Sequence, residues 1–151
     1  MIPHTTTWVA LADRTHARFL ALQGRTLVTV RELEDVRAKQ RNQDFDADRP
    51  GRAFDRVGMG RHALEREHSP TQRAAAAFAK TVAQALGAAR AEGSFERLIL
   101  VAEPGFLGML RRDLDRATQS TVVATIPKAL LRAEQRQLFS ALADQLPLLR
   151  R

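Results

Sequence analysis

LILVAEPG, at residues 98–105, is an unbroken apolar run that ends in a glutamate and a Pro-Gly pair. An apolar run without alternation is typical of a strand that is covered on both faces. Pro104 and Gly105 break the strand, because proline and glycine are the strongest local signals for a change of backbone structure. Residues 98–105 therefore predict a sheet that is buried between two helical layers.

The segment before this run predicts a long helix. Ser69 suits the N-cap, Pro70 suits the first helical position, and Gln72 can complete a capping box. From about residue 74 to residue 91, apolar residues recur at spacings of three and four, which places them on one face of the helix. They are Phe78, Val82, Ala85, Leu86 and Ala89. Gly93 is the expected stop.

The rest of the chain predicts further strands and helices around these two elements. The expected strands cover about residues 7–13, 17–23, 27–33, 97–102 and 121–126. The first three are joined by short turns, which is typical of an antiparallel meander. In the third, alternation places Leu27, Thr29 and Arg31 opposite Val28, Val30 and Glu32. Two more helices are expected, over about residues 106–118 and 132–146.

The order of these elements, βββ-α-β-α-β-α, predicts the fold class. It favours an α/β fold of three layers, in which a five-stranded mixed sheet has helices on both faces. The right-handed crossover rule places the later strands parallel to one edge of the meander. This arrangement is the ribonuclease-H-like topology.

Length and composition limit the possible functions. The 151 residues suit a single domain over residues 1–151, and the absence of cysteine excludes disulfides and thiolate chemistry. The net charge of +7 favours nucleic acid or another anionic partner. No secretory signal and no apolar run long enough to span a bilayer are present, so we expect a cytoplasmic protein without membrane contact. No Walker, GxGxxG or GxSxG motif occurs, and we expect no cofactor.

A long polar segment at about residues 37–69 separates the meander from the long helix. It lacks apolar periodicity, and irregular connections of this length are usually functional or disordered. A guanidinium presents donors that match phosphate, and glycine lets a backbone come close to a ligand. The residues predicted to bind RNA or phosphate are Arg49, Arg52, Arg56, Gly58, Gly60, Arg61 and His62. The alternative is a solvated loop without a ligand, whose aspartates pair with nearby arginines.

Three segments carry a resemblance to a known family: VALADRTHARFL, DRPGRAFDRVGMGRHALE and LILVAEPGFLGMLRRDL. They resemble the bacterial host attachment protein family, which is named as required for attachment to host cells. That family is similar to the middle domain of archaeal and eukaryotic class-1 peptide release factors. The resemblance runs from about Trp8 to Leu146, and it implies a module that associates with ribosomal RNA or tRNA.

The release-factor comparison can be carried over at one loop. In that domain a Gly-Gly-Gln loop, followed by a helix, enters the peptidyl-transferase centre, and the matching loop here is Gly58-Met59-Gly60-Arg61. Met59 interrupts the glycine pair and Arg61 stands where the glutamine is expected, so the resemblance implies no peptidyl-tRNA hydrolysis. Ala129 also departs from the family, which tends to have an aspartate there.

Asp13 and Glu103 end two of the predicted strands and are the candidate acidic residues. Two carboxylates on neighbouring strands can bind a divalent metal for phosphodiester cleavage. The long helix offers no acid between Thr71 and Ala91, so a two-metal site lacks a further ligand. In the other interpretation, Asp13 caps a turn and Glu103 lies at a helix N-terminus.

The sequence leaves three classes of function open. The first is a non-catalytic module that binds ribosomal RNA or tRNA. The second is a protein-interaction factor that supports attachment to host cells, and the third is a metal-dependent nuclease. Salt-dependent RNA binding separates the first class from the second, because contacts to phosphate release counterions.

Overall fold

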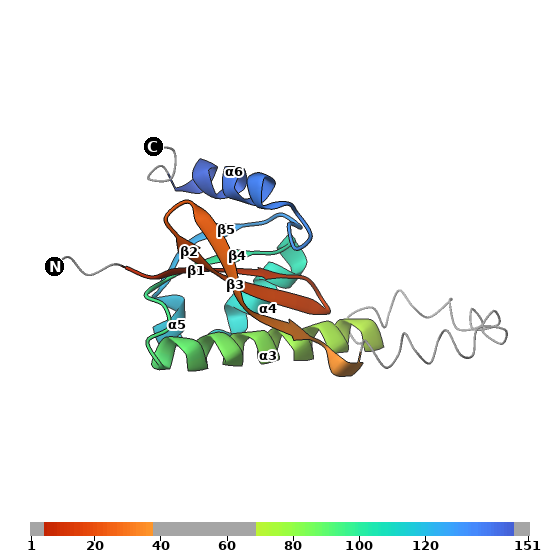
Figure 1. The fold of residues 1–151 in the computed structure, drawn as a ribbon. Helices are drawn as coiled ribbons and strands as arrows, with labels where there is room; N and C mark the ends of the chain where they lie inside the picture. The colour runs from red at the N-terminus through yellow and green to blue at the C-terminus, as the bar shows by residue number, and fades with distance from the viewer. Residues whose placement is uncertain (1–4, 38–68, 147–151) are drawn as a thin grey trace.

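The computed structural model describes residues 5–37 and 69–146. Its strands are β1 (Thr7–Ala12), β2 (His16–Gln23), β3 (Thr26–Glu34), β4 (Arg97–Val101) and β5 (Val122–Ile126). Its helices are α3 (Pro70–Ala91), α4 (Pro104–Asp113), α5 (Arg116–Gln119) and α6 (Gln135–Gln145). Figure 1 shows the sheet between α3, α4 and α5 on one side and α6 on the other. The three-layer α/β fold that the sequence predicts is confirmed.

The five strands form one mixed sheet in the order β3-β2-β1-β4-β5. β2 pairs antiparallel with both β1 and β3. β4 runs parallel to both of its neighbours, β1 and β5. β2 therefore runs against the other four strands, and this order and direction are the predicted ribonuclease-H-like topology.

The start and the end of α3 follow the capping residues in the sequence. The Ser69 Oγ accepts a hydrogen bond from the backbone N–H of Gln72 at 3.0 Å, and Pro70 opens the helix. Gly93 follows the helix at φ 81°, in the left-handed region that favours glycine. Both ends of the helix are thus set by local chemistry.

One hydrophobic core lies between the sheet and the helices α3 and α4. Alternate residues of a strand point to opposite faces, and Trp8 and Ala10 of β1 enter this core. Phe78 of α3 and Phe106 of α4 are buried against them, with ring centroids 6.2 Å apart. The Trp8 ring lies 5.1 Å from the ring of Phe95, which is also buried.

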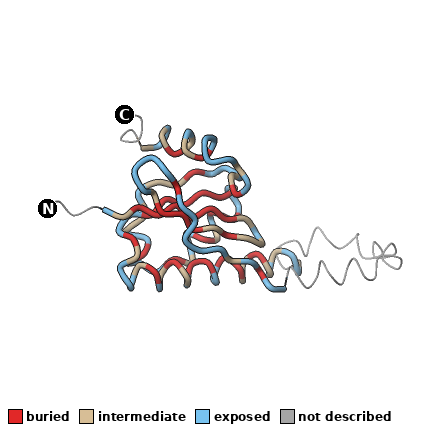
Figure 2. The backbone as a smooth tube through the Cα atoms, viewed as in Figure 1, coloured by how far each residue is buried: buried red, intermediate tan, exposed pale blue. Residues whose placement is uncertain are grey.

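A second hydrophobic core lies between the opposite face of the sheet and α6. Val9 and Leu11 of β1 enter it and meet Leu138 and Leu142 of α6. Figure 2 shows the buried residues concentrated along the central strands. Leu98–Val101 of β4 is buried throughout, because helices cover both faces of this strand, as its unbroken apolar run predicts.

The helix that we expected over residues 106–118 is in fact two helices. α4 ends at Asp113, and Leu114 takes an extended conformation with φ −68° and ψ 138°. Asp115 then caps the short helix α5, because its side chain accepts a hydrogen bond from the backbone N–H of Thr118 at 2.7 Å. The prediction was wrong because the spacing of apolar residues does not reveal that Asp115 caps a second helix.

The last helix also begins later than the expected residue 132. The Arg18 Nη1 of β2 donates to the backbone oxygen of Leu131 at 3.0 Å, so a distant side chain holds the chain just before the helix. Gln135 then opens α6. Its Nε2 donates to the backbone oxygen of Leu27 at 3.1 Å, and its Oε1 accepts from the N–H of Leu27 at 3.4 Å. The start of α6 is thus set by contacts with β2 and β3.

β3 contains a register shift that overturns the expected alternation. Phe19 pairs with Arg31, but Leu20 pairs with Thr29, so Val30 is an extra residue in β3. Residues directly opposite each other share a face of the sheet. Arg31 therefore lies on the face of Phe19, which α3 and α4 cover, while Thr29 lies on the other face. The prediction that Thr29 and Arg31 share a face was wrong.

Candidate functional site

The carboxyl edge of the parallel strands, where β1 and β4 end, is the candidate functional site. β1 and β4 are parallel neighbours. The chain leaves β1 toward β2 on one side of the sheet, and it leaves β4 through α4 toward β5 on the other side. In open α/β sheets, ligands bind outside the carboxyl ends of the strands at such a reversal. Figure 1 shows the end of β3 and the start of α3 on the same side of the molecule.

Asp13 closes the turn between β1 and β2 at this edge. Its Oδ1 accepts hydrogen bonds from the backbone N–H of Thr15 at 2.9 Å and of His16 at 2.7 Å. The Thr15 hydroxyl donates to the same oxygen at 3.3 Å. An aspartate that bonds the backbone two residues on forms an Asx turn. Asp13 therefore caps a turn, as the second interpretation of the sequence holds.

Glu103 is the N-cap of α4. Its Oε1 accepts a hydrogen bond from the N–H of Phe106 at 2.7 Å, and its Oε2 accepts one from the N–H of Gly105 at 3.3 Å. A negative charge there is favourable because of the partial positive charge of a helix N-terminus. A Cβ at Gly105 would lie 3.2 Å from the Glu103 Oε1 and 3.8 Å from the Arg14 Nη2. Arg14 therefore reaches the start of α4.

The geometry favours structural roles for the two edge carboxylates over metal chemistry. Asp13 and Glu103 already accept hydrogen bonds from nearby backbone N–H groups. Across residues 5–37 and 69–146, no three His, Cys, Asp or Glu side chains are grouped so that they could hold a metal ion. Two-metal cleavage needs such a group.

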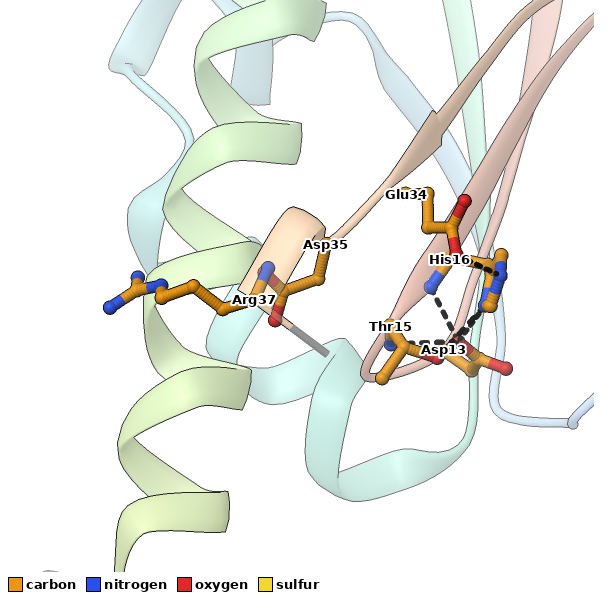
Figure 3. Close-up of polar contacts among 6 residues, drawn as sticks. All are labelled: Asp13, Thr15, His16, Glu34, Asp35 and Arg37. Atoms are coloured by element: carbon orange, nitrogen blue, oxygen red, sulfur yellow. Dashed lines mark hydrogen bonds and ion pairs between the residues drawn. The ribbon is translucent and has the colours of Figure 1, made fainter. Parts of the chain in front are cut away.

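Figure 3 shows His16 between two carboxylates at the same edge. Its Nε2 lies 3.5 Å from the Glu34 Oε2, and its Nδ1 lies 4.0 Å from the Asp13 Oδ1. Its Nδ1 also lies 2.8 Å from the Thr15 Oγ1. These contacts tie the β1–β2 turn to the last residue of β3.

Asp35 follows this network and is buried, with 9% of its surface exposed. Its N–H donates to the backbone oxygen of Thr15 at 2.8 Å, and its Oδ1 accepts from the N–H of Arg37 at 3.0 Å. Its Oδ2 is buried and has no hydrogen-bond partner in the described part of the chain. In Figure 3 the carboxylate points away from His16. A buried oxygen without a donor is costly, so a donor group that reached it would be stabilised there.

Cationic side chains surround the carboxyl edge. They are Arg14, Arg37, Arg73, Lys128 and Arg132, and all five are exposed. Within the two described ranges, no ion pair joins a carboxylate to any of these five side chains. Exposed guanidinium groups that form no ion pair with these carboxylates are available to phosphate oxygens.

A cleft of about 210 Å³ opens between β2, β3 and the connection that precedes α6. His16, Arg18, Glu32 and Arg132 contribute to its wall. Arg18 is held in place, because its Nη1 donates to the backbone oxygen of Leu131 and its Nη2 donates to the Thr29 Oγ1 at 3.1 Å. The cleft thus combines fixed and free cationic groups with one carboxylate.

Every residue that the sequence predicts to bind RNA lies outside the described residues. These are Arg49, Arg52, Arg56, Gly58, Gly60, Arg61 and His62. The described fold contains the two flanks of their segment, Arg37 and Ser69. Sequence reasoning missed the network around His16 and the buried Asp35. The only local signal was Asp13 followed by Arg14 and Thr15, which predicts an Asx turn and not the contacts of His16. Ala129 is exposed in the connection that follows β5.

The fold and the edge define a three-layer α/β protein of ribonuclease-H-like topology, in which Asp13 caps a turn and Glu103 caps a helix at an edge that also carries exposed cationic side chains. The chain belongs to the family described as "Protein required for attachment to host cells", whose sequence model matches residues 8–142. The resemblance found in the sequence is thereby confirmed. No curated protein matches this chain.

Two solved structures are similar to this chain. One is described as an archaeal protein, with 13% sequence identity, a TM-score of 0.47, and coverage of 96% of this chain and 39% of the other. The other is the crystal structure of an archaeal translation termination factor, with the same identity and TM-score and coverage of 96% and 40%. This chain therefore spans about two fifths of either structure's length.

None of the helices in the described residues combines the length and the apolar character that crossing a membrane requires.

Proposed function

We propose that this protein binds structured RNA, either ribosomal RNA or tRNA, without catalysing a reaction on it. The binding surface consists of the carboxyl edge together with the arginines of residues 38–68. The observation that carries the proposal is the set of five exposed cations at the edge, namely Arg14, Arg37, Arg73, Lys128 and Arg132, none of which forms an ion pair within the described residues. A cytoplasmic location is part of the proposal.

The edge presents these cations beside the carboxylates of Asp13, Glu34, Asp35 and Glu103. Contacts between cationic side chains and phosphates supply most of the sequence-independent affinity for nucleic acid. Asp13 and Glu103 would repel phosphate, but their oxygens accept hydrogen bonds from backbone N–H groups. The net charge of +7 adds a long-range attraction.

The residues predicted from the sequence extend this proposed surface. Arg49, Arg52, Arg56, Gly58, Gly60, Arg61 and His62 belong to a segment that joins the described fold at Arg37 and Ser69. Both junctions lie at the carboxyl edge (Figure 1). Because the segment joins the fold at this edge, we include its arginines in the proposed RNA surface.

Filter binding of labelled tRNA and of ribosomal RNA across a salt series tests the proposal. Arg14→Ala combined with Arg73→Ala removes two edge cations. We expect weaker binding and a salt slope that is shallower by about two units, because each phosphate contact contributes roughly one unit.

The control for this experiment is Arg111→Ala combined with Arg112→Ala. It removes the same charge from the end of α4, a helix whose start lies at the carboxyl edge. Equal weakening by both pairs would show a diffuse attraction without a site. Absence of binding to either RNA at low salt would reject the proposed function.

A further inference from the structure

Gly108 lies inside α4, and the described fold gives no reason for a glycine there. Its φ is not positive, since the positive-φ glycines of the described residues are Gly24 and Gly93. A Cβ at Gly108 would meet no atom within 4 Å, whereas a Cβ at Gly87 would lie 2.8 Å from the Asp115 Oδ2. Glycine is, after proline, the poorest helix former. Gly87 therefore serves internal packing, and Gly108 leaves an open space at the surface.

That open space belongs to a cleft of about 480 Å³. Its lining residues are Gly108, Arg111, Arg112, Leu114, Gln119 and Val122. The first three lie on one face of α4, because residues three and four apart are neighbours on a helix. The cleft is thus walled by α4, by the junction between α4 and α5, and by the start of β5.

The cleft is positively charged and held in shape. Arg111 and Arg112 are exposed, and no carboxylate of the described ranges forms an ion pair with either. The Gln119 Nε2 donates to the backbone oxygens of Arg111 at 3.1 Å and of Leu114 at 3.0 Å. These bonds join the end of α4 to α5, so they fix the backbone that carries Arg111 and Arg112.

The cleft opens onto β5, which is the last strand at its edge of the sheet. On its inner side, the backbone oxygens of Thr121 and Ile126 accept hydrogen bonds from the β4 side at 2.9 Å and 3.2 Å. No described strand pairs with its outer side, where a parallel strand directs the N–H and C=O groups of its other residues. Val123 is 49% exposed. β5 therefore offers backbone donors and acceptors directly beside the two arginines.

We propose that this cleft is a docking site for an acidic, extended segment of a partner protein that adds to β5 as a further strand. Strand addition provides affinity through main-chain hydrogen bonds and specificity through alternate side chains. Arg111 and Arg112 bind carboxylates on alternate residues of the segment, and Gly108 gives its backbone room. The charge of the cleft selects an acidic partner, because the charged side chains that line it, Arg111 and Arg112 of α4, are cationic.

This site is distinct from the carboxyl edge. α4 begins at the edge with Pro104, and its arginines lie at its far end, beside the first residue of β5. The docking proposal therefore does not depend on RNA binding, and variants at the two places can be tested independently.

Fluorescence polarisation with a labelled peptide of alternating glutamate and valine, about eight residues long, tests the proposal on the full chain. We expect saturable binding of this peptide and none of the matching peptide of lysine and valine. Arg111→Ala combined with Arg112→Ala should weaken binding on the order of 100-fold, about tenfold for each charge-assisted contact. Arg14→Ala combined with Arg73→Ala removes equal charge elsewhere and should leave binding unchanged.

Two further measurements separate docking from charge attraction. Gly108→Leu fills the open space and improves helix propensity, so we expect loss of peptide binding with no fall in the melting temperature. N-methylation of alternate peptide residues removes the N–H donors along one edge of the peptide strand. Of the two peptides that are methylated at odd or at even positions, one should lose binding.

Several outcomes would overturn the docking proposal. These are no binding of the glutamate peptide at low salt, wild-type affinity of the Arg111 and Arg112 variant, or wild-type affinity of Gly108→Leu. Equal binding of both methylated peptides would overturn strand addition. RNA binding by the same variants should remain at the wild-type level, so failure here is distinguishable from failure of the RNA proposal.

Discussion

Gly87 of α3 packs directly against Asp115, the N-cap of α5: a Cβ on Gly87 would lie 2.8 Å from the Asp115 Oδ2. The carboxylate cannot move away freely, because its Oδ1 accepts from the Thr118 N–H at 2.7 Å and its Oδ2 accepts from the Thr118 hydroxyl at 3.1 Å. One turn along α3, the Arg90 Nε donates to the same hydroxyl at 3.2 Å. The missing side chain at Gly87 thus allows α5 to dock on α3.

Gly87→Ala and Gly108→Ala should change stability in opposite directions. At Gly87 the added methyl displaces the Asp115 cap, and overpacking of this kind costs about 1–3 kcal/mol. At Gly108 the methyl meets nothing, so the gain in helix propensity should stabilise the protein by up to about 1 kcal/mol. Urea unfolding of the two variants measures both effects. The same sign for both would contradict the packing described here.

The stability of the protein should fall in acid partly through Asp115. The backbone N–H of Thr118, and then its hydroxyl, hold the pKa of Asp115 below its ordinary value of 3.8. Because the pKa of Asp115 is lower in the folded state, the ionised carboxylate contributes stability at pH values above its pKa in the unfolded chain. This stability is lost as the pH falls through the pKa of the folded state. Asp115→Asn should therefore reduce stability at pH 7 and flatten the dependence below about pH 4. Thermal unfolding from neutral to acid pH tests this, and an unchanged acid profile would exclude it.

Glu103→Ala should destabilise the protein by about 1 kcal/mol, because it removes the side-chain cap of α4. The matched control is Glu134→Ala. Glu134 is also an N-cap, but its side chain makes no capping hydrogen bond, so its removal should change little. Chemical denaturation of both variants compares them, and equal losses would show that the capping bonds of Glu103 are not what stabilises α4.

Asp13 and Glu103 should act on stability and not on catalysis. We expect no magnesium-dependent cleavage of RNA or DNA, because the two carboxylates are engaged by backbone donors. We also expect no hydrolysis of peptidyl-tRNA, because Arg61 stands where the resemblance to release factors would place the glutamine of the Gly-Gly-Gln loop. Gel assays of nuclease and hydrolase activity check this. Robust turnover that disappears in Asp13→Asn or Glu103→Gln would reverse the assignment.

Arg52→Ala combined with Arg56→Ala should flatten the salt slope of RNA binding by about two units. The proposed surface role predicts a nearly unchanged melting temperature, because surface charges contribute little to stability. Filter binding and thermal unfolding measure the two quantities on the same samples. If the variant unfolds instead, these arginines are structural and the RNA surface is limited to the carboxyl edge.

Local patterns in the sequence determined which elements form. The unbroken apolar run of β4 predicted burial on both faces, and Ser69 and Pro70 predicted the start of α3, because an apolar run and a helix cap can each be recognised from a few consecutive residues. The order of the elements then predicted the topology, since few connections are compatible with right-handed crossovers. The capping role of Glu103 was likewise one of two interpretations available from its position before a proline.

Tertiary contacts decided the features that join residues distant in the chain. The extra residue Val30 in β3 depends on its register with β2, and the late start of α6 depends on Arg18, which holds Leu131 from more than a hundred positions away. The unexplained opening at Gly108 appears only when its neighbours in space are known. A pattern of spacing specifies the backbone that a residue prefers, whereas registers, long-range hydrogen bonds and free volume are set by the packing of whole elements against one another.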